Sequence, residues 1–87
     1  MKLINILGQN FEVVGSTGNA TRGGTLLCAP TEKDFDMKFF STFFSVVTGT
    51  MGDMEVAGLW PIKVVEFQDT KFVVMKYDCM KELKEGE

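Results

Sequence analysis

The segment from residue 31 to residue 49 constrains the fold of this chain most, because its large apolar side chains recur at helical spacing. Thr31 is suited to the N-cap position, acidic residues follow it, and Gly49 is suited to the C′ position. Apolar residues fall at i, i+4 and i+7 as the pairs Phe39-Phe40, Phe43-Phe44 and Val46-Val47. This spacing predicts a helix over residues 32–48.

The apolar arc of this predicted helix is unusually wide. It covers roughly 200° of the circumference, whereas a surface helix needs a stripe of only about 100°. The polar strip is narrow and consists of Asp34, Lys38, Ser41, Thr42 and Ser45. Two interpretations stay open: the helix lies in the concave face of its own sheet, or its excess apolar face contacts a second subunit.

Runs rich in β-branched and aromatic residues flank this segment on both sides and indicate strands. They cover residues 3–7, 11–14 and 25–29 before it, and 54–60, 62–67 and 71–77 after it. The first two runs form a hairpin around a turn at residues 8–10, and the last two runs form the strongest hairpin. Pro61 limits the run 54–60 to an edge strand. We expect one α+β domain over residues 1–87: a mostly antiparallel sheet of about five or six strands, in the order β-β-β-α-β-β-β, packed on one amphipathic helix. Residues 79–87 are expected to form a charged tail.

Composition excludes several classes of function. The chain has no histidine, which removes the usual general base and the usual nucleophile-activating residue. Its net charge of −3 offers no basic surface for nucleic acid. Two cysteines without metal-ligand spacing, and no run long enough to span a membrane, favour the cytoplasm. No cofactor and no metal ion is predicted.

A glycine-rich stretch, residues 15–24, is the first candidate site. It contains no large apolar side chain and is expected to be a loop. Glycines let backbone N–H groups approach an anion closely, and an arginine adds a charge-assisted contact. The predicted ligand is a phosphate or nucleotide, held by Gly15, Ser16, Thr17, Gly18, Asn19, Thr21, Arg22, Gly23 and Gly24. The alternative is a flexible loop on which nothing packs.

Acidic residues at the start of the predicted helix are the second candidate, because paired carboxylates can perform acid–base catalysis or bind a hard cation. Glu32 and Asp34 are also explained as residues that begin a helix. Asp36 falls inside the apolar arc and is less easily explained. A carboxylate-based enzyme therefore requires Asp36 to lie buried beside another acid.

A third set of residues has the character of protein-interface anchors, which are often aromatic residues or methionine. Its members are Phe40, Phe44, Trp60, Met54 and Tyr77, and the alternative is that these residues belong to the core. Residues 1–30 carry only three charged side chains, which suggests burial there, within the domain or against a partner. The sequence therefore favours a non-enzymatic interaction protein that forms homo-oligomers. A virus-encoded inhibitor that blocks a host factor is one form of this hypothesis, and a nucleotide- or phosphate-binding protein is the alternative.

Overall fold

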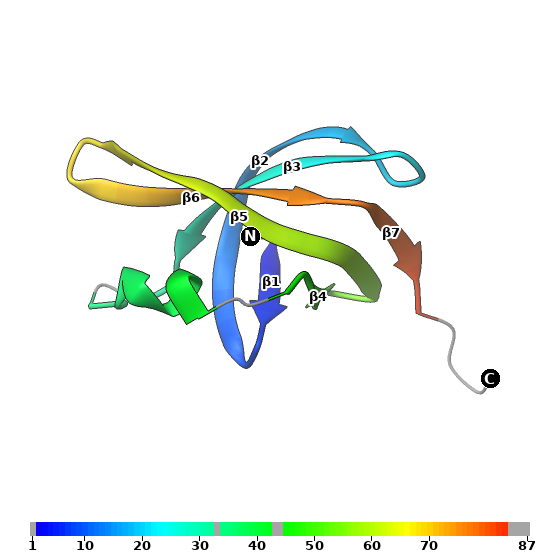
Figure 1. Ribbon diagram of the computed structural model, residues 1–87, viewed down its shortest axis with the longest axis horizontal. Coiled ribbons are helices and arrows are strands. Elements are labelled where there is room, and N and C mark those ends of the chain that lie inside the picture. Colours follow the sequence, from blue (N-terminus) through cyan, green and yellow to red (C-terminus); the bar gives the residue numbers. More distant parts are fainter. Residues whose placement is uncertain (1, 33, 43–44, 84–87) are drawn as a thin grey trace.

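The computed structural model describes residues 2–32, 34–42 and 45–83, and they form a small β-barrel (Figure 1). Most of these residues lie in strands, and the only helical element among them is one short 3₁₀ helix, η1. The elements in chain order are β1 (Leu3–Ile6), β2 (Gln9–Asn19), β3 (Gly23–Pro30), η1 (Met37–Thr42), β4 (Val47–Met51), β5 (Met54–Phe67), β6 (Thr70–Tyr77) and β7 (Cys79–Glu82).

Two antiparallel meanders, β1-β2-β3 and β4-β5-β6, build the barrel. The sheet runs in the order β4-β1-β2-β3-β6-β5-β7, and pairing of β4 with β5 closes six strands on themselves. The two meanders meet where β1 pairs with β4 and where β3 pairs with β6. Strand β7 continues from β6 and pairs with the first residues of β5 outside the closed ring.

Alternating side chains of these strands fill the barrel, as the period of two in a strand requires. Along β6, Val73 and Met75 are fully buried, whereas the intervening Val74 is only half-buried. Nine side chains are fully buried and form the centre of the core: Ile4, Ile6, Phe11, Leu26, Cys28, Val56, Leu59, Val73 and Met75.

The predicted α+β fold, with a sheet packed on a helix over residues 32–48, is wrong. Only residues 37–42 are helical, as η1, and β4 begins at Val47. Gly49, predicted to end the helix, is a buried residue of β4 that pairs with Val56. Phe43 of the predicted helix and Phe44, which is also a predicted interface anchor, lie outside the described residues.

An aromatic cluster explains why helical spacing of apolar residues predicted a helix that is not there. The ring of Phe11, on β2, lies 5.2 Å from that of Phe35, 5.9 Å from that of Phe39 and 5.3 Å from that of Phe40. These phenylalanines therefore cover one end of the barrel, and a short 3₁₀ turn places them there as well as a helix would. Their burial depends on Phe11, which is distant in sequence.

Three further segments differ from the prediction. Residues 15–24 form a β-hairpin rather than a loop, since β2 pairs with β3 as far as Asn19 and Gly23. Strand β5 runs through Pro61, which lies beside a β-bulge, a position where a strand tolerates proline. Residues 79–82 are a strand rather than a charged tail. The predicted hairpins at the start of the chain and at residues 62–77 are confirmed.

Both cysteines are free thiols, with Cys28 in the core and Cys79 half-buried on β7. Within the described part of the chain, no helix is long and apolar enough to cross a membrane.

Candidate functional site

The second half of β5 and the start of β6 leave the barrel as a two-stranded arm, residues 61–72. The first half of β5 pairs with β4 and with β7, whereas residues 63–67 pair only with β6. Residues 70–72 of β6 in turn pair only with β5, because β3 pairs with β6 from Val73 onward. Figure 1 shows this hairpin extending from the barrel on the side of η1. The arm thus offers two faces and two edges.

Apolar side chains are exposed along the β5 strand of the arm. The exposed fractions are 52% for Ile62, 49% for Val64, 37% for Val65 and 63% for Phe67. A two-stranded ribbon has no core of its own, so a large part of the apolar surface of these side chains remains in water. Large exposed apolar patches in small proteins mark interaction surfaces.

The outer face of the arm is continuous with the outside of the barrel. Val65 lies directly opposite Phe72, and Lys63 lies opposite Val74, so these four side chains share one face. Phe72 and Val74 are half-buried. The result is an apolar stripe that ends at the exposed Phe67 and has Lys63 at its side.

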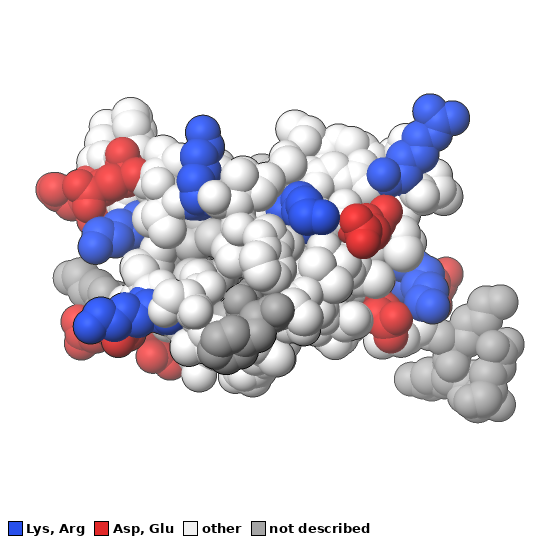
Figure 2. Space-filling model, viewed as in Figure 1, with Lys and Arg blue, Asp and Glu red and all other residues white. Residues whose placement is uncertain are grey.

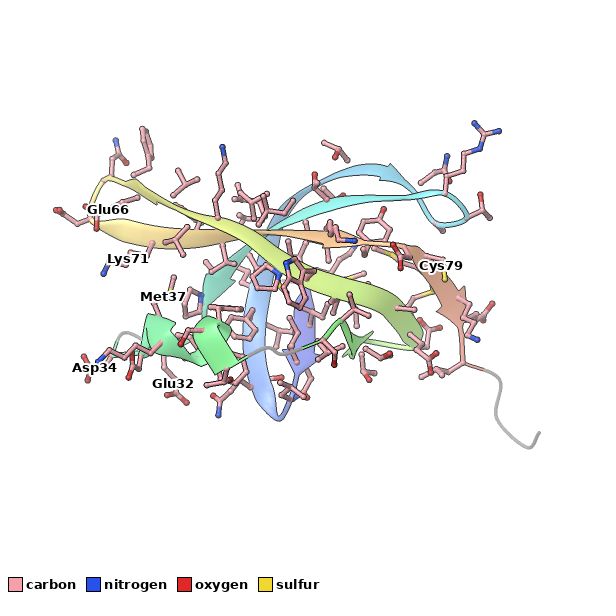
Figure 3. All side chains as sticks on the ribbon, viewed as in Figure 1. Glu32, Asp34, Met37, Glu66, Lys71 and Cys79 are labelled. Carbon is pink, nitrogen blue, oxygen red and sulfur yellow. The ribbon has the colours of Figure 1, made fainter. Side chains whose placement is uncertain are left out.

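The inner face of the arm lies over the segment that contains η1. Figure 3 shows Glu66 and Lys71 on the arm, above Met37, Asp34 and Glu32. A groove of about 370 Å³ separates the two parts, lined by Pro30, Glu32, Phe35, Met37, Asp69, Thr70 and Lys71. Its lining combines the apolar side chains of Pro30, Phe35 and Met37 with the charged side chains of Glu32, Asp69 and Lys71.

Sequence reasoning missed the arm as a site. Residues 62–67 were interpreted only as half of a hairpin. A signal was present, however, because a strand with one solvated face should alternate apolar and polar residues. Ile62, Val64, Val65 and Phe67 are apolar on both faces, which indicates a strand that needs cover on both sides.

The predicted interface anchors lie in different surroundings. Phe40 is buried in the aromatic cluster, and Tyr77 is buried with its hydroxyl donating to the carbonyl oxygen of Thr17 over 3.2 Å. Trp60 and Met54 are half-buried on β5, six residues apart in the sequence. Phe44 lies outside the described residues. Of this set, Trp60 is nearest to the arm in the chain.

The glycine-rich stretch has a structural explanation. Gly18 lies opposite Gly24 in the β2–β3 hairpin, and a β-carbon on either residue would collide with the backbone of the other strand. At the tip, the Oδ1 atom of Asn19 accepts hydrogen bonds from the backbone N–H groups of Thr21, at 3.1 Å, and Arg22, at 2.8 Å. These N–H groups, which the prediction assigned to an anion, therefore already have a partner.

Part of the same hairpin lines a pocket at one end of the barrel. The pocket has a volume of about 310 Å³ and is lined by Lys2, Val13, Val14, Gly15, Ser16, Gly18, Asn19, Ala20, Leu26, Met51, Tyr77 and Met80. Four of the nine predicted ligand-binding residues belong to this set: Gly15, Ser16, Gly18 and Asn19. The other five do not line it: Thr17, Thr21, Arg22, Gly23 and Gly24. Lys2 is the only positively charged side chain in the lining.

The acidic residues at 32–36 line a shallow pocket that also includes Phe35 and Phe39. Asp36 is exposed, and its Oδ1 atom accepts a 2.9 Å hydrogen bond from the backbone N–H of Lys38. The condition for a carboxylate enzyme, a buried Asp36 beside another acid, is thus not met. Within the described ranges, no group of three or more acidic or cysteine side chains is placed to hold a metal ion.

Charges of both signs are interspersed over the face shown in Figure 2, with no continuous basic patch on that face. Comparison of the chain with protein-family models, with curated protein sequences and with solved structures finds no significant match.

Proposed function

We propose that this chain is a non-enzymatic protein-binding module and that the β5–β6 arm is its binding surface. The observation that carries the proposal is the exposure of Ile62, Val64, Val65 and Phe67 on a ribbon that has no core of its own. Covering these side chains with a partner removes apolar surface from water, at about 25 cal/mol per Å². A host factor or another copy of the chain is the partner class that the sequence favoured.

The arm also has the shape that strand-mediated recognition needs. An extended segment of a partner adds to an unpaired strand edge through backbone hydrogen bonds, and side-chain pockets supply selectivity. Residues 63–67 of β5 provide such an edge, and the groove beneath the arm provides a pocket. The free thiols of Cys28 and Cys79 are compatible with action in the cytoplasm.

The test compares two lysine substitutions at exposed apolar positions. Phe67→Lys alters the tip of the arm, and Leu7→Lys alters a residue with 56% exposure in the β1–β2 turn. Each variant is immobilised and exposed to lysate of the source cells, and the bound proteins are quantified by mass spectrometry. We expect wild type and Leu7→Lys to retain the same partner and Phe67→Lys to lose it. Equal retention by all three proteins would exclude the arm as the binding surface.

The pocket at the end of the barrel favours one alternative, the binding of a small ligand. Its lining combines apolar side chains with Lys2 and with Ser16 and Asn19 from the glycine-rich hairpin. Native mass spectrometry of gently purified protein, repeated after addition of a nucleotide pool, tests this candidate. Binding in the pocket predicts a retained ligand mass that is lost in Lys2→Ala and kept in Arg22→Ala, since Arg22 is not part of the lining. Loss in Arg22→Ala alone would instead place the ligand at the hairpin tip.

A further inference from the structure

The β5 strand of the arm has one edge that no described strand covers. Residues 63–67 pair with β6 on one side, while β4 and β7 pair only with residues up to Leu59. An unpaired edge presents a row of N–H and C=O groups that can bind another strand.

The turn of the arm determines which backbone groups point outward. Gln68 and Asp69 both have positive φ values, 51° and 63°, as in a type I′ turn. The pair that closes such a two-residue turn, Phe67 with Thr70, exchanges both backbone hydrogen bonds. Hydrogen-bonded pairs alternate along an antiparallel ladder, so Val65 also bonds to β6. The N–H and C=O groups of Val64 and Glu66 therefore point to the uncovered edge.

A second copy of this edge satisfies these groups completely in one register. When two β5 edges run antiparallel with Val65 opposite Val65, each Val64 lies opposite the Glu66 of the other copy. The N–H and C=O groups of both residues in both copies then bond across the two-fold axis, as a hydrogen-bonded pair does. In this register, each outward N–H and C=O group of Val64 and Glu66 therefore has a hydrogen-bond partner.

Charges also select this register. It places Lys63 of one copy opposite Phe67 of the other on the outer face, where an ammonium group can lie against an aromatic ring. Centring the pairing on Lys63 or on Glu66 would bring two like charges directly opposite each other, which is destabilising. Centring it on Val64 would place Glu66 opposite Ile62, which lies in the β-bulge of β5 and interrupts the ladder.

The outer faces of the two arms join in the same arrangement. Val65 of each copy lies opposite Phe72 within its own arm, so Val65 and Phe72 of the two copies form one continuous apolar row. The central pair of Val65 side chains is a non-hydrogen-bonded pair, with Cα atoms roughly 4.5 Å apart. The side chains at the axis thus pack against each other across the two paired strands.

We infer that the chain forms a homodimer by antiparallel pairing of the β5 edges of two arms, centred on Val65. This inference rests on the proposed function, because it names a second copy as a partner of the arm.

Cross-linking at the two-fold axis tests the register. In a Cys79→Ser background, Val65→Cys is expected to give a covalent dimer on mild oxidation, because the Cα separation suits a disulfide. The matched variant Val64→Cys, on the same edge, is expected to give no covalent dimer under the same conditions, because it lies opposite Glu66 of the other copy. Cross-linking of Val64→Cys but not of Val65→Cys would overturn the proposed register.

Sedimentation over a wide concentration range tests the dimer itself. Glu66→Pro removes an outward N–H group while leaving the bonds between β5 and β6 in place, and Glu66→Ala keeps that N–H group. We expect wild type and Glu66→Ala to dimerise and Glu66→Pro to weaken the dimer at least tenfold. A wild-type chain that stays monomeric overturns the dimer. If Phe67→Lys still loses a partner in that case, the arm remains a binding surface for a different protein.

Discussion

Gly58 on β5 lies directly beneath the side chain of Asp78, the residue that separates β6 from β7. A β-carbon on Gly58 would collide with the Cβ, Cγ and Oδ2 atoms of Asp78. The backbone N–H of Asp78 donates a 2.8 Å hydrogen bond to the carbonyl oxygen of Ala57, so the two segments cannot separate freely. This contact lies where β5 passes from pairing with β7 to pairing with β6.

Gly58→Ala is therefore expected to destabilise the barrel strongly. Gly58 has a φ of 76°, a conformation that costs a residue with a β-carbon about 1–2 kcal/mol, and the collision with Asp78 adds to that cost. Gly52→Ala is the matched control, because Gly52 has a φ of 62° and open space around it. Urea unfolding should show a larger loss of unfolding free energy for Gly58→Ala than for Gly52→Ala. Adding Asp78→Gly to Gly58→Ala should restore part of that free energy. Equal losses of unfolding free energy in Gly58→Ala and Gly52→Ala would show that the collision with Asp78 is relieved at no cost.

The aromatic cluster gives a second prediction. Phe11 is fully buried and contacts three other rings, so Phe11→Ala should lower the free energy of unfolding by about 3–5 kcal/mol. Phe67→Ala, at the exposed tip of the arm, should change it by less than about 0.5 kcal/mol. Chemical denaturation of both variants measures the two effects. A small effect of Phe11→Ala would mean that the cluster does not hold the end of the barrel closed.

The hairpins of this fold could be predicted from the sequence, because their determinants are local. Alternating side chains and short polar turns specify β1–β2 and β5–β6 without reference to the rest of the chain. The predicted helix failed because its evidence was not local. Phe35, Phe39 and Phe40 pack against Phe11, and only the folded barrel brings these residues together.

The candidate site could be predicted only in part. Glycines in residues 15–24 were taken as signs of a loop, but Gly18 and Gly24 are required by the close approach of β2 and β3. The arm could not be predicted as a site for a different reason. A sequence shows that Val64 and Val65 are both apolar, but only the strand order shows that no other strand covers residues 63–67.

Cys28 gives a third prediction, on pH dependence. Burial raises the pKa of the Cys28 thiol from its ordinary value of 9.0 to about 12. Above pH 9 the unfolded chain loses this proton while the folded chain keeps it, so the free energy of unfolding should fall as pH rises from 9 to 12. The limiting slope from one such group is about 1.4 kcal/mol per pH unit.

Cys28→Val is the control for that slope, since it keeps an apolar side chain of similar size and removes the titrating group. Other groups titrate equally in both proteins, so the difference between the two stability curves isolates Cys28. In native protein a thiol reagent should modify Cys79, which is half-buried, and should reach Cys28 only on unfolding. Parallel stability curves, or rapid modification of two thiols per native chain, would contradict this prediction.

The turn of the arm gives the last prediction. Gln68 and Asp69 occupy both central positions of a type I′ turn, where positive φ values favour the dipeptide Asn-Gly. The double variant Gln68→Asn with Asp69→Gly should therefore gain about 1 kcal/mol of stability, which for a domain of this size raises the melting temperature by roughly 4–8 °C. Thr70→Gly, one residue further on in β6, should lower the melting temperature, because a strand position gains nothing from a glycine.

The same double variant links the turn to binding. A more rigid arm loses less conformational freedom when a partner covers it, so association through the β5 edge should become tighter, not weaker. Calorimetry measures the melting temperature, and sedimentation at matched concentrations measures the association. A higher melting temperature with unchanged association would mean that the arm is already ordered before it binds. A higher melting temperature with weaker association would mean that the partner requires a different turn, and hence a different conformation of the arm.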